Sequence, residues 1–349
     1  MHIRNLVWNS VERRPRALVR LLIGFFVIAT FAVVGTIVAD LVSVAFVQPL
    51  SFGYLVLTTL GLGLGAVIGA LVVARYIDQR PVTDYGFRER KVWGRDLVVG
   101  AGLALLAQTV AVGVALSAGW AVVVDTIVAG PEGLILGLVG ALLLFAVVGF
   151  YEELVARGVI LKNVAEGFAS YGTVPAVLAA IIVSSVVFGI VHLANAGASL
   201  VSVVVIAVIA ITVAASYVLT GRLALAIGFH TSWNISMGVL FGQPVSGIEL
   251  PAHILALEVT GPTSWTGGAF GFEAGFLGVV AGFVGLVGVI TYVYVVEGSL
   301  RIDPGLLVPT LRGRSDEESA AIRGDSRVDD VYAESNIDVS HDGSVTLEK

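Results

Sequence analysis

Residues 133–158 read GLILGLVGALLLFAVVGFYEELVARG, and this stretch decides how the rest of the chain is interpreted. Its first part, residues 133–150, carries no charged side chain and is close to the length of a membrane-spanning helix. Two adjacent carboxylates, Glu152 and Glu153, and then Arg157 follow directly. Ionisable side chains are costly at membrane depth and usually line a polar cavity or pathway there. The stretch therefore predicts a functional site inside a membrane helix.

The composition of the whole chain agrees with a membrane protein. Of its 349 residues 57% are hydrophobic and 13% are charged, and the mean hydropathy is +0.94. Soluble globular chains carry about 25% charged residues. We therefore expect an all-α, polytopic bundle of membrane helices. The absence of cysteine excludes disulfides, thiolate metal sites and cysteine nucleophiles.

Apolar runs separated by turn signals predict eight transmembrane helices. The expected helices cover residues 17–47, 54–73, 97–123, 133–165, 175–192, 200–219, 223–240 and 272–296. The second helix contains Gly61, Gly63, Gly65 and Gly69, whose small-xxx-small spacing permits close helix packing. The expected parts of the chain are a basic arm (1–16), three N-terminal helices (17–132), a core of helices four to seven that carries the charged stretch (133–242), an outer connector with helix eight (243–296), and an acidic, disordered tail (297–349).

Basic residues lie in alternate connectors. They occupy the N-terminal arm, residues 75–95, the positions Arg157, Lys162 and Arg222, and the stretch after helix eight. The connectors after helices three and seven have no lysine or arginine. By the positive-inside rule, both termini are expected to be cytoplasmic, in a multi-pass protein of the cell membrane.

The two carboxylates are expected to have different roles. Glu153 and Arg157 are four residues apart, so they face each other across one helical turn and form a neutralising pair. Glu152 points about 100° away around the helix, so the same arginine does not easily serve both. One carboxylate is left for other work.

Three further polar positions stand out on the neighbouring helices. His192 closes the fifth helix one turn after Phe188, and His230 and Asn234 share one face of the seventh. Glu152 and His192 lie about equally far from the turn near residue 172, so we expect them at similar depth in an antiparallel hairpin. Glutamate and histidine together can deprotonate a water, and histidine with asparagine can stabilise an oxyanion. Alternatively, Glu152, His192 and His230 are a set of zinc ligands. No His-Glu-x-x-His motif is present.

The ordered trio of Glu152-Glu153-x-x-x-Arg157, Phe188-x-x-x-His192 and His230-x-x-x-Asn234 resembles the CPBP intramembrane endopeptidases. That family includes type II CAAX prenyl proteases and bacteriocin-processing and self-immunity proteins. The resemblance covers roughly residues 133–240. It implies that Glu152 and His192 activate the attacking water, that His230 and Asn234 stabilise the oxyanion, and that Glu153, Arg157 and Phe188 support the site. Ala156 departs from the family, many members of which have an aromatic residue there.

The leading interpretation is an intramembrane endopeptidase, either a glutamate or a metallo-enzyme, with a CAAX-type prenylated peptide as one substrate class. Its expected partners are membrane lipid and a peptide or protein substrate, with no nucleic acid. One alternative is a non-catalytic immunity or chaperone-like membrane protein. A second is a proton-coupled transporter with Glu152 and His192 as a relay, although the sequence shows no internal repeat.

Overall fold

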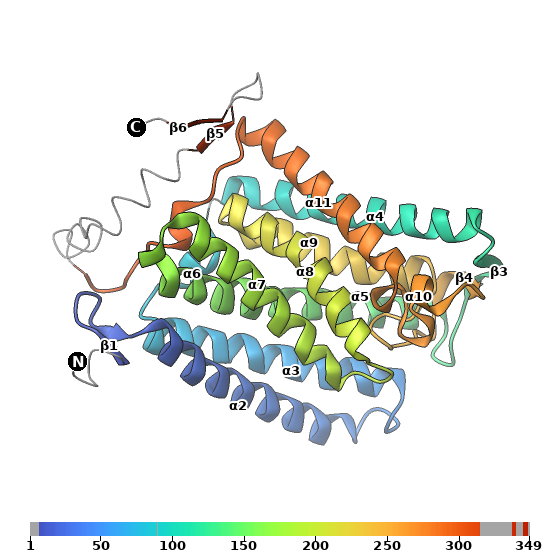
Figure 1. Cartoon of the computed structure of the whole chain (residues 1–349). Helices are drawn as coiled ribbons and strands as arrows, with labels where there is room; N and C mark the ends of the chain where they lie inside the picture. Colours follow the sequence, from blue (N-terminus) through green and yellow to red (C-terminus); the bar gives the residue numbers. More distant parts are fainter. Residues whose placement is uncertain (1–6, 89, 315–336, 340–344, 348–349) are drawn as a thin grey trace.

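The computed structural model describes residues 7–88, 90–314, 337–339 and 345–347. Figure 1 shows a bundle of roughly parallel and antiparallel helices, with both ends of the described chain at one end of the bundle and β3, β4 and α10 at the other. Within the described residues, eight helical segments are long and apolar enough to cross a membrane, which confirms the predicted all-α polytopic bundle. The spans are 17–43, 52–77, 91–117, 134–171, 173–194, 200–220, 223–240 and 276–297.

The helices and strands follow in chain order. They are β1 (Trp8–Asn9), β2 (Arg14–Pro15), α2 (Ala17–Ser43), α3 (Phe52–Val72), α4 (Arg90–Ser117), β3 (Ala121–Val128), α5 (Leu134–Glu153), α6 (Lys162–Phe168), α7 (Thr173–Val191), α8 (Leu200–Thr220), α9 (Leu223–Asn234), β4 (His253–Val259), α10 (Thr263–Thr266), α11 (Phe276–Glu297), β5 (Ile337–Val339) and β6 (Val345–Leu347). Short π-helical segments continue α3 (Val73–Ile77), α5 (Leu154–Leu161) and α9 (Ile235–Leu240). Single 3₁₀ turns cover Val82–Tyr85, Ala169–Tyr171, His192–Ala194, Gly268–Phe270, Phe272–Ala274 and Pro304–Leu306.

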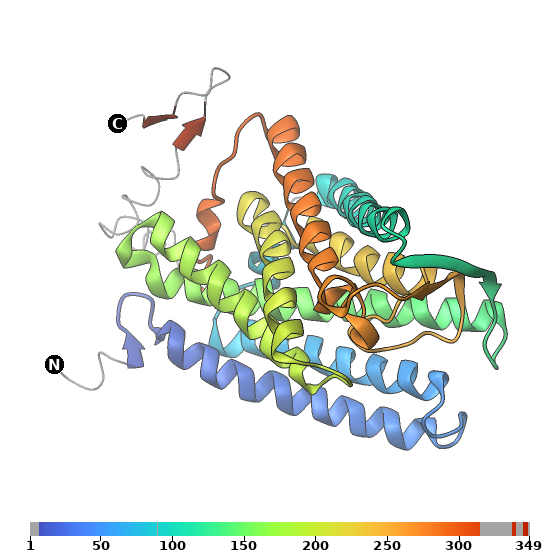
Figure 2. The same cartoon turned by 45° about the vertical axis from the view of Figure 1, so that its right-hand side comes forward.

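The α9 span lies at the centre of the bundle. Of its residues 72% are buried, against 11% of the most apolar stretch of α2, which lies at the edge beside α3. Figure 2 shows the same arrangement from a second direction, with α2 and α3 together on one side. Side chains on α9 are therefore enclosed by protein, whereas α2 presents most of its surface to the outside.

Glycines allow two of the helix pairs to touch, α2 with α3 and α4 with α9. A Cβ built on Gly35 of α2 would lie 2.1 Å from the carbonyl oxygen of Gly61 in α3, and one on Gly65 would lie 2.1 Å from that of Phe31. A Cβ on Gly228 of α9 would lie 2.0 Å from the carbonyl oxygen of Leu97 in α4. The predicted close packing through the glycine-rich second helix is confirmed, because any larger residue at these positions would force the helices apart.

The expected boundaries of the third and eighth helices were wrong. The third helix runs from Arg90 to Ser117 rather than over residues 97–123, and Ala121–Val128 forms β3, which pairs antiparallel with β4. The run of β-branched residues in β3 suits a strand as well as a helix, and its partner in the outer connector decides between the two. The last helix begins at Phe276 rather than at residue 272, because Gly271 (φ +94°) interrupts the backbone before it.

The ordered chain also extends further than composition indicated. Disorder was expected from residue 297, but Leu306 and Leu307 are buried in the core, and the amide of Asp303 donates to the carbonyl of Val218 at 3.0 Å. The amide of Arg312 donates to the carbonyl of Gln79 at 2.8 Å. The apolar residues 306–308 therefore hold this part of the polar tail to the bundle. Residues 315–336, 340–344 and 348–349 of the expected tail lie outside the described residues.

A buried ionic network joins the N-terminal arm to α6. Glu166 accepts hydrogen bonds from Arg14 (2.9 Å), Arg20 (2.7 Å) and Arg80 (2.7 and 2.9 Å), and all four side chains are at most 4% exposed. Burial acts to lower the pKa of the Arg80 guanidinium, but the carboxylates of Glu166 and Asp78 raise it above its usual value. The basic arm and the basic connector are therefore part of the folded bundle.

Candidate functional site

The candidate site begins where α5 changes its helical form. α5 ends at Glu153, and the π-helical segment Leu154–Leu161 continues it. Likewise, α9 ends at Asn234 and a π-helical segment follows. π-Helical turns inside longer helices are frequent at functional sites, because the wider turn re-aims the side chains beside it. Two of the three predicted motifs, those of Glu152 and of His230, therefore adjoin such a turn.

The predicted pair of Glu153 and Arg157 is present. The Nη1 and Nε atoms of Arg157 lie 3.2 and 3.1 Å from the two carboxylate oxygens of Glu153, and both side chains are fully buried. The Nη2 atom donates to the carbonyl of Ala210 in α8 at 2.9 Å, and the guanidinium lies 4.9 Å from the ring centre of Phe188. Arg157 thus holds α5, α7 and α8 together around the carboxylates.

Glu153 also holds His230. The Nδ1 atom of His230 lies 2.7 Å from Oε1 of Glu153, so the ring donates from Nδ1 to the carboxylate. This contact depends on a close approach of α5 and α9, because a Cβ built on Gly149 would lie 2.2 Å from Oγ1 of Thr231. The glycine one turn before Glu153 brings the two helices within hydrogen-bonding reach at this depth.

Glu152 faces a different set of groups. Its Oε1 accepts a hydrogen bond from the hydroxyl of Tyr151 at 3.0 Å, and its side chain is 19% exposed. Its Oε2 lies 3.8 Å from Nε2 of His230 and is buried with no hydrogen-bond partner among the described residues. A buried acceptor without a partner is costly, so this oxygen is suited to a water or a substrate group.

His192 is oriented by its own helix. Its Nδ1 lies 2.7 Å from the carbonyl oxygen of Phe188, and because a carbonyl only accepts, Nδ1 carries the proton. In the neutral ring, Nε2 is then free to accept a hydrogen bond. The ring of Phe188 packs against both histidines, at 4.8 Å from His192 and 5.6 Å from His230.

Two cavities meet at Phe188 and His192, which line both of them. The larger cavity, about 310 Å³, contains Glu152 and is otherwise mainly apolar. Its wall comes from α2, α3, α5 with its π-helical continuation, and α7: Ile28, Ala32, Leu62, Ala66, Tyr151, Val155, Ala156, Ile160, Val187, Val191 and Asn195. The smaller cavity, about 30 Å³, contains Glu153, His230 and a further carboxylate, Glu273. The structure thus gathers Glu152, His192 and His230 around adjoining spaces.

Asn234 is placed differently. It lies one turn after His230 and is buried, but it does not line either of the two cavities formed by the described residues.

Sequence reasoning missed Trp233 and Glu273, which do line the smaller cavity. For Glu273 a signal existed, since it is the one charged residue in the apolar, glycine-rich stretch AFGFEAGF at 269–276.

The zinc alternative does not fit the geometry of these side chains. Within residues 7–88 and 90–314 and the two short C-terminal strands, no three His, Asp or Glu side chains converge closely enough to hold a metal ion. We therefore assign no step to a metal.

The eight apolar helices define a multi-pass membrane protein. The carboxylate and histidine side chains at its mainly apolar cavity form a candidate hydrolytic site. Residues 133–236 match the family model described as type II CAAX prenyl endopeptidase Rce1-like. This match over residues 133–236 confirms the resemblance seen in the sequence, and it supports an intramembrane CAAX-type endopeptidase at the level of the family. The matched residues run from the start of α5 to the π-helical turn after α9 and contain all seven predicted site residues. No curated protein and no solved structure matches the chain.

Proposed function

We propose that this protein is an intramembrane endopeptidase that hydrolyses a peptide bond of a lipidated, CAAX-type substrate. The observation that carries the proposal is the buried, unpartnered Oε2 of Glu152, which faces Nε2 of His230 at 3.8 Å beside His192. A carboxylate and two imidazoles around one space can bind a water, accept its proton and stabilise the negative charge that develops on the substrate oxygen. The Rce1-like match over these helices supports peptide hydrolysis as the reaction.

In this proposal, Glu152 is the general base. A water held between its Oε2 and Nε2 of His192 loses a proton to the carboxylate as its oxygen attacks the carbonyl carbon of the scissile bond. The proton then passes from Glu152 to the leaving amine as the carbon–nitrogen bond breaks. Tyr151 donates to Oε1, which leaves Oε2 for the water. The partly exposed position of Glu152 at the larger cavity suits a group that must reach substrate.

His230 and Asn234 are proposed to stabilise the oxyanion. Glu152 and Glu153 carry two negative charges and Arg157 one positive charge, so a protonated His230 makes the buried set electrically neutral. In that state Nδ1 donates to Glu153, and Nε2 is left to donate to the oxyanion. Asn234 lies one turn along α9. It would donate a second hydrogen bond to the oxyanion once bound substrate displaces the side chains that separate Asn234 from the cavity.

The larger cavity supports a lipid-bearing substrate. Its wall includes Ile28 and Ala32 from α2, the helix most open to the surroundings, and Val187 and Val191 from α7. Val191 is 55% exposed, so this wall continues onto the outer surface of the bundle. An apolar cavity that reaches the lipid-facing surface and ends at a catalytic carboxylate suits a prenyl chain beside its peptide.

The test is hydrolysis by the full chain reconstituted in lipid vesicles. The substrates are a farnesylated peptide ending in a CAAX sequence and the same peptide without the farnesyl group, with products identified by mass spectrometry. We expect cleavage of the farnesylated peptide after the modified cysteine and little cleavage of the other. Glu152→Gln should slow the cleavage by about 10²–10⁴-fold, whereas Glu258→Gln, at an exposed carboxylate of β4, should leave it unchanged. Cleavage by Glu152→Gln at the wild-type rate would refute the assignment of the base, and equal cleavage of both peptides would refute the lipidated substrate class.

A further inference from the structure

Glu273 enters the site from the opposite end of the bundle to the two chain termini. It belongs to the short 3₁₀ turn Phe272–Ala274, directly before α11 and well outside the residues that match the Rce1-like family. Gly271 (φ +94°) lets this turn fold inward, since a Cβ there would lie 2.0 Å from the carbonyl oxygen of Pro244. The connector between α9 and α11 therefore closes over the bundle and directs one carboxylate into it.

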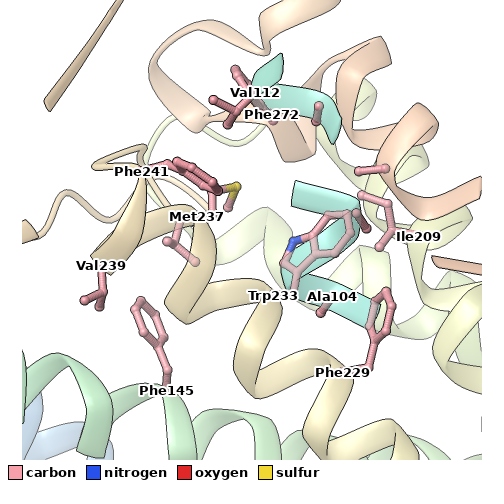
Figure 3. Packing of buried hydrophobic residues seen from close by; sticks show 14 of the residues in the cluster. Ala104, Val112, Phe145, Ile209, Phe229, Trp233, Met237, Val239, Phe241 and Phe272 are labelled. Carbon is pink, nitrogen blue, oxygen red and sulfur yellow. The ribbon is translucent and has the colours of Figure 1, made fainter. Parts of the chain in front are cut away.

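The carboxylate of Glu273 is held by three hydrogen bonds. Its Oε1 accepts from Nε1 of Trp233 at 2.9 Å, and its Oε2 accepts from the amide and the hydroxyl of Ser246 at 2.8 and 2.6 Å. Figure 3 shows Trp233 and Phe229 projecting from α9 on the side of Ile209, with the indole nitrogen of Trp233 visible. An ionised carboxylate offers about four lone-pair sites, so Glu273 keeps acceptor capacity for one more partner.

The smaller cavity is the space that this remaining capacity faces. Its polar wall consists of Glu153, His192, His230 and Glu273, and its apolar wall includes Val213. Its volume of about 30 Å³ exceeds the roughly 10–15 Å³ that a single buried water requires. A buried water also requires two to four polar partners, and this cavity offers that number. It is too small for a peptide or lipid group.

We propose that the smaller cavity is a water site, closed on its far side by Glu273, which stores the water for hydrolysis behind His192 and His230. Because His192 lines both cavities, a water can pass from the smaller cavity to Glu152 in the larger one. This inference rests on the proposed peptidase function. It adds a positioning residue, Glu273, from a part of the chain that no motif identified.

The decisive variant fills the cavity without disturbing a hydrogen bond. Val213→Ile adds one methylene at the apolar wall and retains a β-branched side chain in α8. The matched control is Val208→Ile, on the same helix at a position that is 40% exposed on the outer surface. We expect Val213→Ile to lower kcat roughly tenfold with KM unchanged, and Val208→Ile to match the wild type. A kcat for Val213→Ile equal to that of Val208→Ile would overturn the proposal.

Glu273 is tested by Glu273→Gln, which has nearly the same shape but opposes an amide donor to the donors of Ser246. We expect a fall in kcat with KM unchanged, in protein that remains monodisperse. Should this variant fail to fold, the Val213→Ile comparison still decides.

A measurement that does not use activity separates this proposal from the peptidase itself. A cryo-electron microscopy map that resolves waters should show density between His192, His230 and Glu273 in the wild type and none in Val213→Ile. An empty cavity in the wild-type map would refute the water site even if the protein hydrolyses peptides. Density in the map of a protein without peptidase activity would instead refute the proposed function and leave the water site standing.

Discussion

Oε1 of Glu153 accepts a hydrogen bond from Nδ1 of His230 at 2.7 Å, and this contact joins the first and third motifs of the site. The same carboxylate pairs with Arg157, which donates to the backbone of α8. Glu153 therefore does more than neutralise an arginine, because it fixes the ring of the histidine proposed to stabilise the oxyanion. A ring held at Nδ1 presents Nε2 in a defined direction, towards Glu152.

The two adjacent carboxylates should respond differently to the same substitution. Glu152→Gln removes a base at a carboxylate that is partly exposed, so turnover should fall by about 10²–10⁴-fold while folded yield stays near wild type. Glu153→Gln leaves Arg157 as an unpaired buried cation, so folded yield should fall. Yield is measured as the monodisperse fraction in detergent, and turnover per folded molecule. If well-folded Glu153→Gln is inactive and Glu152→Gln is active, the two roles are reversed.

A double substitution tests the ion pair itself. Glu153→Gln with Arg157→Met removes both charges together, so its folded yield should exceed that of either single variant. The amide oxygen of the new glutamine can still accept a hydrogen bond from Nδ1 of His230. A loss of folded yield in the double variant would therefore not come from displacement of this histidine. Yield from size-exclusion chromatography measures the difference. A double variant that is no better than the worse single variant would show that the two charges are not coupled.

The contact between α5 and α9 at Gly149 should be sensitive to a single methyl group. Gly149→Ala places a Cβ 2.2 Å from Oγ1 of Thr231, so the helices must separate and the 2.7 Å contact of Glu153 with His230 must lengthen. We expect lower thermal stability and lower turnover. Adding Thr231→Ala removes the contacted oxygen and should restore part of both.

The matched control for that substitution is Gly102→Ala in α4, where a new Cβ meets no atom within 4 Å. It should be neutral, or slightly stabilising because alanine favours helix over glycine. Measurements of Tm and turnover on these three variants and the wild type give the comparison. Equal effects of Gly149→Ala and Gly102→Ala would mean that the helix contact does not position the site.

Much of this arrangement could be predicted from the sequence because its signals are local. Long apolar runs located the eight helices, and the spacing of Glu153 and Arg157 by one helical turn predicted their pair. The similar depth of Glu152 and His192 followed from their equal distance to the turn at Gly172, and both line the larger cavity.

The parts that could not be predicted depend on contacts distant in the sequence. β3 pairs with β4 across more than a hundred residues, and nothing in a run of valines indicates which partner it will meet. Glu273 reaches the site only because its connector folds back onto α9. Helical periodicity shows which residues share a face, but it does not show which loop covers that face.

The orientation in the membrane is predicted from the positive-inside rule and can be tested by labelling. Because the chain has no cysteine, a single introduced cysteine gives an unambiguous signal. Ser10 and Thr310 are exposed near the two termini, and Asp125 and Ser264 are exposed near β3 and α10 at the other end. In oriented vesicles, a membrane-impermeant maleimide should label the first two from the cytoplasmic side and the last two from the opposite side. Labelling of Ser10 and Ser264 from one side would refute the eight-span topology.

The ionic network around Glu166 should contribute strongly to stability. Glu166 is 4% exposed and accepts from three arginines, so Glu166→Gln leaves an excess of positive charge among buried groups. Removing one partner from a buried ion pair costs about 3–5 kcal/mol of unfolding free energy. The matched control is Glu297→Gln, because Glu297 pairs with Arg222 at 2.9 Å but is 43% exposed. An exposed pair contributes at most about 1 kcal/mol. Unfolding of the detergent-purified proteins should therefore show a large fall in Tm for Glu166→Gln and almost none for Glu297→Gln. If the fall in Tm for Glu166→Gln is as small as that for Glu297→Gln, water reaches the arginines and charge does not hold the arm to α6.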